Sequence, residues 1–223
     1  MRSLFWVAAA LAVIAALLLT ILPRGITRPE TSEKPRLSAA FRPDLIRLDL
    51  YIFVLHTVLT ASFVALPFLL RNDLGVLLGN HWKIYIGALL VSLVGTVPLI
   101  LADERKGKAS TVAAAILLLL VGQLVLTFAG STPIRVLAAL AIFFAGFNFL
   151  EAGLPARLSI RATGDARGAS LGVFASSQFL GAFAGGVLGG WFLAGGSPAT
   201  VFAVCAAICA LWFVLHRLAG KDE

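Results

Sequence analysis

Charged side chains are scarce in this sequence, and long apolar runs take their place. Only 13% of the 223 residues are charged, 60% are hydrophobic, and the mean hydropathy is +0.97. A soluble domain of this size does not need so much apolar surface, whereas repeated apolar runs of about 20 residues are typical of membrane-spanning helices. The composition therefore predicts an all-α polytopic membrane protein whose main surroundings are the lipid bilayer.

Histidine and cysteine are also rare, and neither is grouped as an enzyme or a metal site requires. The three histidines fall in separate segments, and the sequence holds no HExxH, no GxSxG and no glycine-rich phosphate loop. Cys205 and Cys209 are spaced for one helix face, which disfavours a disulfide, and they lack zinc or redox spacing. We expect no enzyme activity, no catalytic residue, no metal and no cofactor. A seven-helix retinal protein is also excluded, because the last apolar run lacks the lysine that would form the Schiff base with retinal.

Seven apolar runs are long enough to cross a membrane. They cover 4–22, 50–70, 84–102, 111–129, 136–154, 168–194 and 199–215. The sequence thus predicts a transmembrane helix in 1–22, a proline-containing cytoplasmic linker in 23–49 and a six-helix bundle in 50–223. A signal peptide is the competing interpretation of the first run. That run exceeds a typical h-region and no small-x-small cleavage motif precedes Pro23, so we expect a retained span.

The basic residues predict the orientation of these spans. Lys and Arg outnumber Asp and Glu by 18 to 11, but they lie in short loops between apolar runs, so nucleic acid is not an expected partner. With the N-terminus outside, the inner segments 23–49, 103–110, 155–167 and 216–223 hold 14 of the 18 Lys and Arg residues. The positive-inside rule then predicts an external N-terminus and a cytoplasmic C-terminus.

Polar side chains within the expected spans are the candidate functional residues, since such groups are costly at membrane depth. They are His56, Gln123, Asn148, Glu151 and Gln178. His56 is either a neutral imidazole bonded to a neighbouring helix or a transport group that carries protons. Glu151 is either a carboxylate of a substrate or proton pathway or a solvated helix end paired with Arg157 or Arg161. The glutamines also suit inter-helix hydrogen bonds.

Glycine recurs at helical spacing in the run 168–194. Gly181, Gly185 and Gly189 share one helix face at intervals of four, and Gly186 and Gly190 repeat the interval beside them. In lipid, small residues spaced in this way let helix backbones approach closely. The pattern predicts a tight helix-packing seam.

Three stretches resemble the C-terminal half of major facilitator superfamily transporters, and within that superfamily the YajR-like efflux group. They are LDLYIFVLHTVLTASFVALPFLL at 48–70, FNFLEAGLPARLS at 147–159 and GVFASSQFLGAFAGGVLGGW at 172–191, and LFWVAAALAVI at 4–14 is similar to the family's sixth helix. The resemblance covers nearly the whole chain. The turn carrying Glu104, Arg105, Gly107 and Lys108 resembles the second copy of the family's cytoplasmic D-R-x-G-R/K loop motif. Here Glu replaces Asp and Lys replaces the last Arg.

The resemblance implies a fold of twelve helices in two halves built from inverted repeats, of which this chain would supply the sixth to the twelfth. It also implies proton-coupled export of a small molecule across a bacterial inner membrane, with protons and a missing N-terminal half as partners. His56, Gln123, Asn148, Glu151 and Gln178 would line or gate the pathway. The alternative is a structural or assembly subunit of the membrane that pairs with another half and does not transport.

Overall fold

The structure is a computed structural model that describes residues 2–21, 40–106, 108–162 and 166–219. Every regular element in those ranges is a helix. Six of these helices are long and apolar enough to cross a membrane. The prediction of an all-α polytopic membrane protein is therefore confirmed.

The chain divides into two units, residues 1–34 and residues 35–223. The first unit contains α1 (Arg2–Ile21), whose side chains from Phe5 to Thr20 are all exposed within the unit. That apolar stretch is shorter than the six membrane-spanning candidates. The crossing of the membrane by this helix accordingly stays a prediction.

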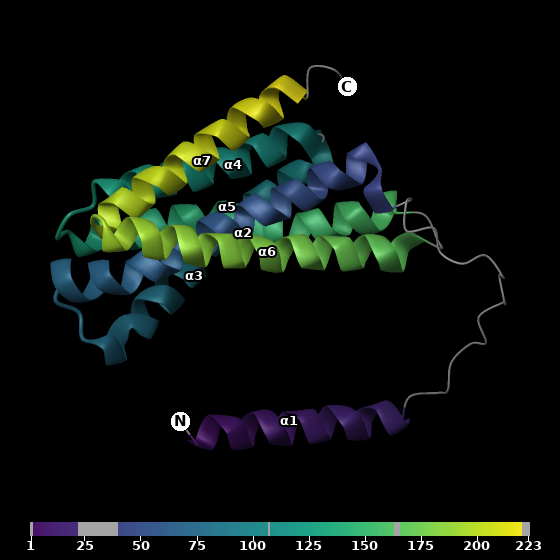
Figure 1. Ribbon diagram of the computed structural model, residues 1–223, viewed down its shortest axis with the longest axis horizontal. Helices are drawn as coiled ribbons and strands as arrows, with labels where there is room; N and C mark the ends of the chain where they lie inside the picture. The colour runs from purple at the N-terminus through teal and green to yellow at the C-terminus, as the bar shows by residue number, and fades with distance from the viewer. Residues whose placement is uncertain (1, 22–39, 107, 163–165, 220–223) are drawn as a thin grey trace. The chain divides into compact units, whose positions relative to one another are not determined.

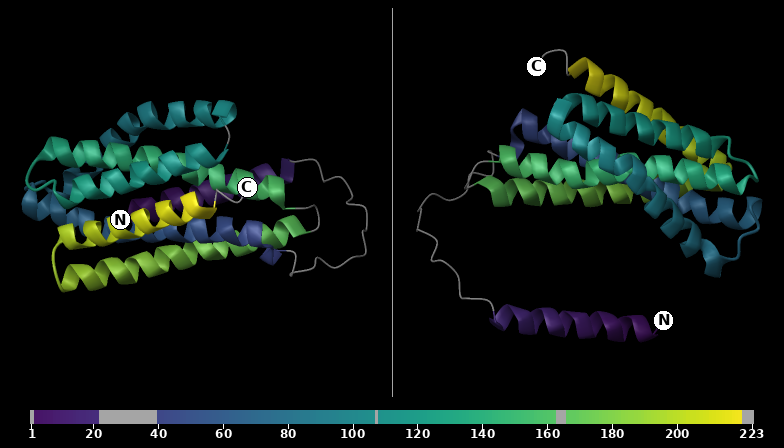
Figure 2. Two further views of the ribbon diagram at one scale, coloured as in Figure 1. Left: turned by 90° about the horizontal axis from the view of Figure 1, so that it is seen from above. Right: turned by 180° about the vertical axis from the view of Figure 1, so that it is seen from behind.

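The second unit is a bundle of six long helices (Figure 1). They are α2 (Pro43–Phe68), α3 (His81–Lys106), α4 (Lys108–Thr127), α5 (Pro133–Arg161), α6 (Arg167–Ala194) and α7 (Pro198–Ala219). A π-helical turn, η2 (Leu69–Asp73), continues α2, and a short 3-10 turn, η3 (Leu78–Asn80), precedes α3. The two further views in Figure 2 show α6 beside α2 and α4 beside α5, pairs that are in extensive contact.

Two helix boundaries differ most from the sequence-based expectation, and a proline is involved in each. Helix α2 begins at Pro43, within the expected linker, because proline suits the first helical turn, where its missing N–H has no partner to lose. Helix α5 does not end at Leu154 but runs through Pro155 to Arg161. Membrane helices tolerate an internal proline because neighbouring helices can compensate for the freed backbone group. Arg157, expected in a loop, is therefore helical and buried.

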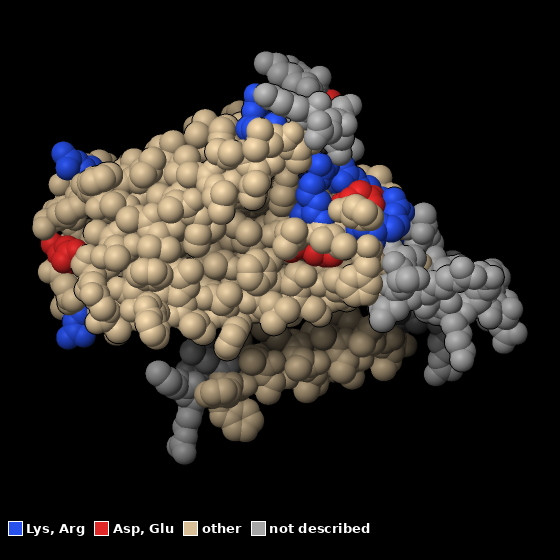
Figure 3. All heavy atoms as spheres, turned by 45° about the horizontal axis from the view of Figure 1, so that its top comes forward, with Lys and Arg blue, Asp and Glu red and all other residues tan. Residues whose placement is uncertain are grey.

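The interior of the bundle is formed mainly by α2, α4, α5 and α7. By contrast, α3 and α6 each bury only 17% of their most apolar 18-residue window. Figure 3 shows the charged side chains gathered at the two ends of the bundle, with a broad uncharged belt between them. An uncharged belt between charged ends is the surface that a bilayer requires.

Candidate functional site

Three of the candidate polar residues meet inside the bundle, each from a different helix. Nε2 of His56 on α2 lies 3.0 Å from Oε2 of Glu151 on α5. The amide nitrogen of Gln178 on α6 lies 2.9 Å from the same His56 Nε2 and 3.2 Å from Glu151 Oε1. The structure thus brings together residues that are 95 and 122 positions apart in the chain.

This cluster lies far from the helix ends. At about 1.5 Å per residue, His56 is roughly 20 Å from the start of α2 at Pro43, and Glu151 is roughly 15 Å from the end of α5 at Arg161. Sequence reasoning placed Glu151 near a helix end because it expected the helix to stop before Pro155. The continuation of α5 instead leaves the carboxylate deep within the span.

The cluster is partly open. The side chain of Glu151 is 36% exposed and that of His56 is 13% exposed. The ring of Phe147, one turn before Glu151 on α5, packs edge-on against the imidazole with ring centroids 5.9 Å apart. The imidazole is held in place, while the carboxylate lies where a proton or a cationic group can reach it.

The glycines of α6 bring Gln178 within reach of His56. A Cβ atom placed on Gly181 or Gly185 would overlap the backbone of α2 at Phe53 or Thr57, so only glycine permits this approach. The Thr57 hydroxyl also donates a hydrogen bond to the Gly181 carbonyl, at 3.1 Å. The two backbones therefore touch at Phe53 and Thr57, on either side of His56 in α2.

The other glycines of the expected seam differ in their surroundings. Gly189 also lies against α2, because its Cβ would come within 2.9 Å of the Cα of Ala61. A Cβ on Gly186 would make only an ordinary contact with Thr60, at 3.9 Å, and one on Gly190 would meet nothing within 4 Å. The close approach thus involves one glycine face of α6.

The three polar contacts define what the cluster can do with a proton. Nε2 of a neutral histidine is either a donor or an acceptor, never both. If Glu151 is protonated, either its hydroxyl or the Gln178 amide can donate to the single lone pair of an unprotonated Nε2, and the amide can also donate to Oε1. If the proton moves to Nε2, that nitrogen donates to the Glu151 carboxylate and no longer accepts from Gln178. The cluster can therefore hold a proton on Glu151 or on His56. The Gln178 amide can donate to Glu151 in both cases but to Nε2 only in the first.

The remaining predicted polar residues lie elsewhere. The Asn148 amide donates a hydrogen bond to Ser92 Oγ on α3, at 3.1 Å, and is not part of the cluster. Gln123 on α4 is fully buried and donates to Ser62 Oγ on α2, at 2.7 Å, while its own Oε1 has no partner among the described residues. Both side chains join neighbouring helices.

The predicted loop motif lies largely outside the described residues. Gly107 is not described, and neither are the side chains of Arg105 and Lys108; Glu104 is exposed at the end of α3. Asp103, the residue just before Glu104, was not named as a candidate in the sequence analysis.

Asp103 and Arg157 form an ion pair that the sequence analysis did not predict. The Arg157 guanidinium donates to both carboxylate oxygens of Asp103, at 2.8 and 2.9 Å, and the Thr111 hydroxyl donates to the same carboxylate. These contacts join α5, α3 and α4. Arg157 is consequently paired with Asp103 and not with Glu151, for which it was one expected partner. The available signal was a carboxylate just beyond the expected span 84–102 and basic residues just beyond the expected span 136–154, which the predicted topology places on the same side of the membrane.

A further acidic residue, Asp49, is buried within α2. Its exposed fraction is 6%, and its Oδ1 has no hydrogen-bond partner among the described residues.

No group of three or more His, Cys, Asp or Glu residues in the described ranges is arranged to hold a metal ion.

The fold and the cluster together describe a polytopic helical membrane protein with a titratable pair at depth. No protein-family model matches the chain. Over 222 residues, which are 96% of this chain and 49% of the relative, it is 32% identical to the inner membrane transport protein YajR of Escherichia coli. It is 28% identical over 191 residues to the uncharacterized transporter BU466 of Buchnera aphidicola from Acyrthosiphon pisum, and 28% identical over 177 residues to an uncharacterized transporter of the Buchnera from Baizongia pistaciae.

These comparisons show similarity to membrane transporters over most of the chain. The alignments cover 82% and 78% of this chain for the two Buchnera proteins, and 49% and 45% of those proteins. The chain therefore spans about half the length of the curated relatives it matches.

Proposed function

We propose that this chain is the C-terminal half of a major facilitator superfamily transporter that exports a small molecule in exchange for protons. The observation that carries the proposal is the contact among His56, Glu151 and Gln178. An ionisable pair at membrane depth marks a transport or proton pathway by default, because isolated charges there are costly. A shared proton would leave the pair neutral overall. Its loss would leave one negative charge on Glu151, which would attract a cationic substrate or drive a rearrangement of the helices.

The proposal includes a missing partner half. Alternating access requires two bundles that move about a site near the middle of the membrane, and the described unit provides one bundle of six helices. The curated relatives are about twice as long as the matched region. The apolar faces of α3 and α6, which are the least buried of the six, would contact the second bundle. In this arrangement the cluster would face the pathway between the halves.

The proposed location is a bacterial inner membrane, which is where the name of the E. coli relative places that protein. The proposed orientation has the N-terminus outside and the C-terminus in the cytoplasm, on the charge distribution of the loops. Asn148 and Gln123 are assigned supporting roles at the edges of the pathway, since each links two helices. The substrate would be a small molecule.

The proton role is tested by infrared difference spectroscopy of the full chain in lipid while the pH is changed. Every carboxylate of the chain contributes to the carboxyl band on acidification, so the component of one residue is found by subtracting the spectrum of its Gln variant. We expect the component of Glu151 to change frequency in Gln178→Leu, which removes its hydrogen-bond donor, and the component of Glu104 to stay unchanged. Glu104 is the matched control because it is an exposed glutamate at the end of a neighbouring helix. A Glu151 component that keeps its frequency in Gln178→Leu would contradict the proposed cluster.

Transport is tested in vesicles with an imposed pH gradient, with and without a co-expressed N-terminal half. We expect gradient-driven substrate movement only with both halves, and none in the assembly carrying Glu151→Gln. Robust transport by the 223-residue chain alone would contradict the need for a second half.

The alternative is a membrane structural or assembly subunit that pairs with another half and does not transport. The fully buried Gln123–Ser62 contact and the Asp103–Arg157 pair would serve such a role equally well. A neighbouring reading frame with five spans and the first copy of the loop motif would favour the transporter. An assembly that forms with that half but moves no substrate under an imposed pH gradient would favour the subunit.

A further inference from the structure

A groove between α2 and α7 is separate from the cluster described above. It has a volume of about 340 Å³ and is lined by Arg47, Leu50, Tyr51 and Val54 of α2 and by Ile208, Leu211, Trp212, Leu215, His216 and Ala219 of α7. Helical spacing places Arg47, Tyr51 and Val54 on the side of α2 opposite His56. The groove therefore cannot be part of the proposed proton site.

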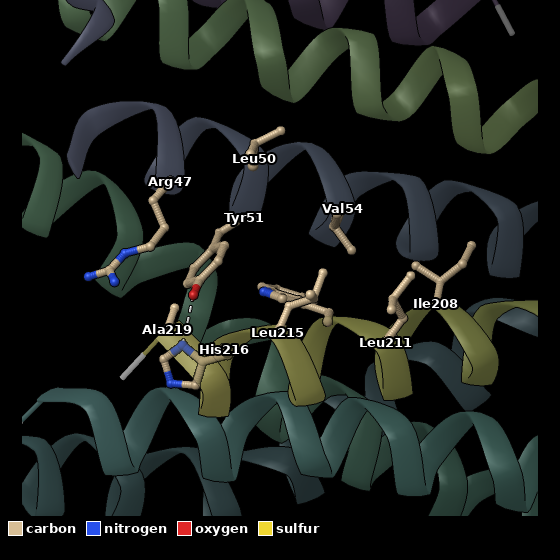
Figure 4. Close-up of a pocket in the computed structure, with 10 residues that line it drawn as sticks. Arg47, Leu50, Tyr51, Val54, Ile208, Leu211, Leu215, His216 and Ala219 are labelled. Atoms are coloured by element: carbon tan, nitrogen blue, oxygen red, sulfur yellow. Dashed lines mark hydrogen bonds between the residues drawn. The ribbon is translucent and has the colours of Figure 1, made fainter. Parts of the chain in front are cut away.

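The polar residues of the groove are confined to one end. Figure 4 shows Arg47, Tyr51 and His216 together, with Val54, Leu211 and Ile208 toward the other end. Tyr51 Oη and His216 Nδ1 form a hydrogen bond of 2.7 Å. This end is close to the first residue of α2, Pro43, and to the last residue of α7, Ala219. It consequently lies at the membrane surface, and the apolar end lies deeper.

The walls of the groove are apolar and face outward. Leu50, Leu211 and Leu215 are 57%, 61% and 55% exposed. Beneath them Trp212 is buried and packs edge-on against Tyr51, with ring centroids 5.3 Å apart. The Trp212 indole N–H has no hydrogen-bond partner in the described part of the chain. The groove thus has a rigid aromatic floor and walls suited to hydrocarbon.

The lining of the polar end contains a basic side chain and no carboxylate. Arg47 lines this end, and Arg217 follows His216 at the exposed end of α7, while no acidic residue is among the lining residues. Basic pockets between helices at the membrane surface recruit anionic headgroups. A volume of about 340 Å³ is too small for a transmembrane helix, whose diameter with side chains is about 10 Å, but it suits a single flexible chain.

We propose that this groove binds one anionic phospholipid, with its phosphate at the Arg47–His216 end and one acyl chain along Val54, Ile208 and Leu211. A lipid has the same order of groups as the groove, an anion at the surface followed by hydrocarbon. The bound lipid would join the start of α2 to the end of α7.

The test is native mass spectrometry of the delipidated full chain with added dioleoyl phosphatidylglycerol or, separately, dioleoyl phosphatidylcholine. We expect one tightly held phosphatidylglycerol, retained at least about fivefold better than phosphatidylcholine. Leu211→Trp fills the groove and should abolish this retention. Val214→Trp is the matched control, because Val214 is 51% exposed on the same helix and does not line the groove.

A second pair of variants tests the headgroup. Arg47→Gln should remove the preference for phosphatidylglycerol over phosphatidylcholine, whereas Arg71→Gln, an exposed arginine just beyond the other end of α2, should keep it. If Leu211→Trp does not fold, Leu215→Trp fills the same wall and replaces it. Equal retention by the wild type and the filled variant, equal loss in both tryptophan variants, or no headgroup preference in the wild type would overturn the proposal.

Discussion

The glycine face of α6 allows a prediction in which the same chemical change is made at two positions of one helix. Gly185→Ala adds a methyl group against the carbonyl oxygen of Thr57, whereas Gly190→Ala adds it where no atom lies within 4 Å. At Gly185 the obstacle is backbone, so no rotamer change can relieve it, and α6 must move away from α2. At Gly190 the methyl group enters open space.

The difference between the two variants can be calculated from their contacts. Overpacking costs about 1–3 kcal/mol, and a shift of α6 also puts at risk the Thr57–Gly181 hydrogen bond, which is worth about 0.6 kcal/mol. Replacing glycine by alanine in a helix otherwise stabilises by about 0.5–1 kcal/mol, and this gain cancels in the comparison because both variants have it. We therefore expect Gly185→Ala to be less stable than Gly190→Ala by roughly 2–4 kcal/mol, about 30-fold or more in the ratio of folded to unfolded protein.

The assay is reversible unfolding of the full chain in mixed micelles by increasing SDS, followed by the fluorescence of its four tryptophans. Gly186→Ala, whose added atom makes only an ordinary contact, should behave like Gly190→Ala. If Gly185→Ala unfolds at the same SDS fraction as the other two, the backbones of α2 and α6 do not touch and the argument fails.

The same unfolding assay tests two other contacts. Asp103→Asn should destabilise the bundle by roughly 3 kcal/mol, because it leaves the buried Arg157 guanidinium without its counter-charge, while Glu104→Gln should have almost no effect. Gln123→Met should cost less than about 1 kcal/mol, because it removes one hydrogen bond worth about 0.6 kcal/mol together with a buried oxygen that has no partner. For the orientation, a reporter fused after Glu223 should report the cytoplasm, and a periplasmic signal would reverse the predicted topology.

The helical class and the membrane location follow from local sequence. A run of about 20 apolar residues has few ways to satisfy its backbone in lipid other than as a helix, so composition and run length are sufficient. The glycine interval could be read in the same way, because spacing along one helix determines which residues share a face. The sequence of α6 alone therefore indicated that Gly181, Gly185 and Gly189 would lie on one face and pack against a neighbouring helix.

The partners of these residues required the tertiary structure. Helical periodicity states which side of a helix a residue occupies, but not which helix it meets, and His56, Glu151 and Gln178 come from three helices. From the sequence, each of the three was only a separate polar residue within an apolar span. Asn148, which shares a face of α5 with Glu151, was an equally good candidate, yet it bonds to Ser92 on α3.

The ends of helices were the least predictable feature, and the site depended on one of them. A proline within a soluble helix usually ends or bends it, so Pro155 indicated that Glu151 was close to a loop. In this bundle α5 continues to Arg161, and the packing of its last turns, through the Arg157–Asp103 pair, stabilises that continuation. Sequence alone thus determined that a carboxylate and an imidazole would lie in apolar spans. Only the packing of helices decided that they would share a hydrogen bond, because long-range contacts place a side chain and local spacing does not.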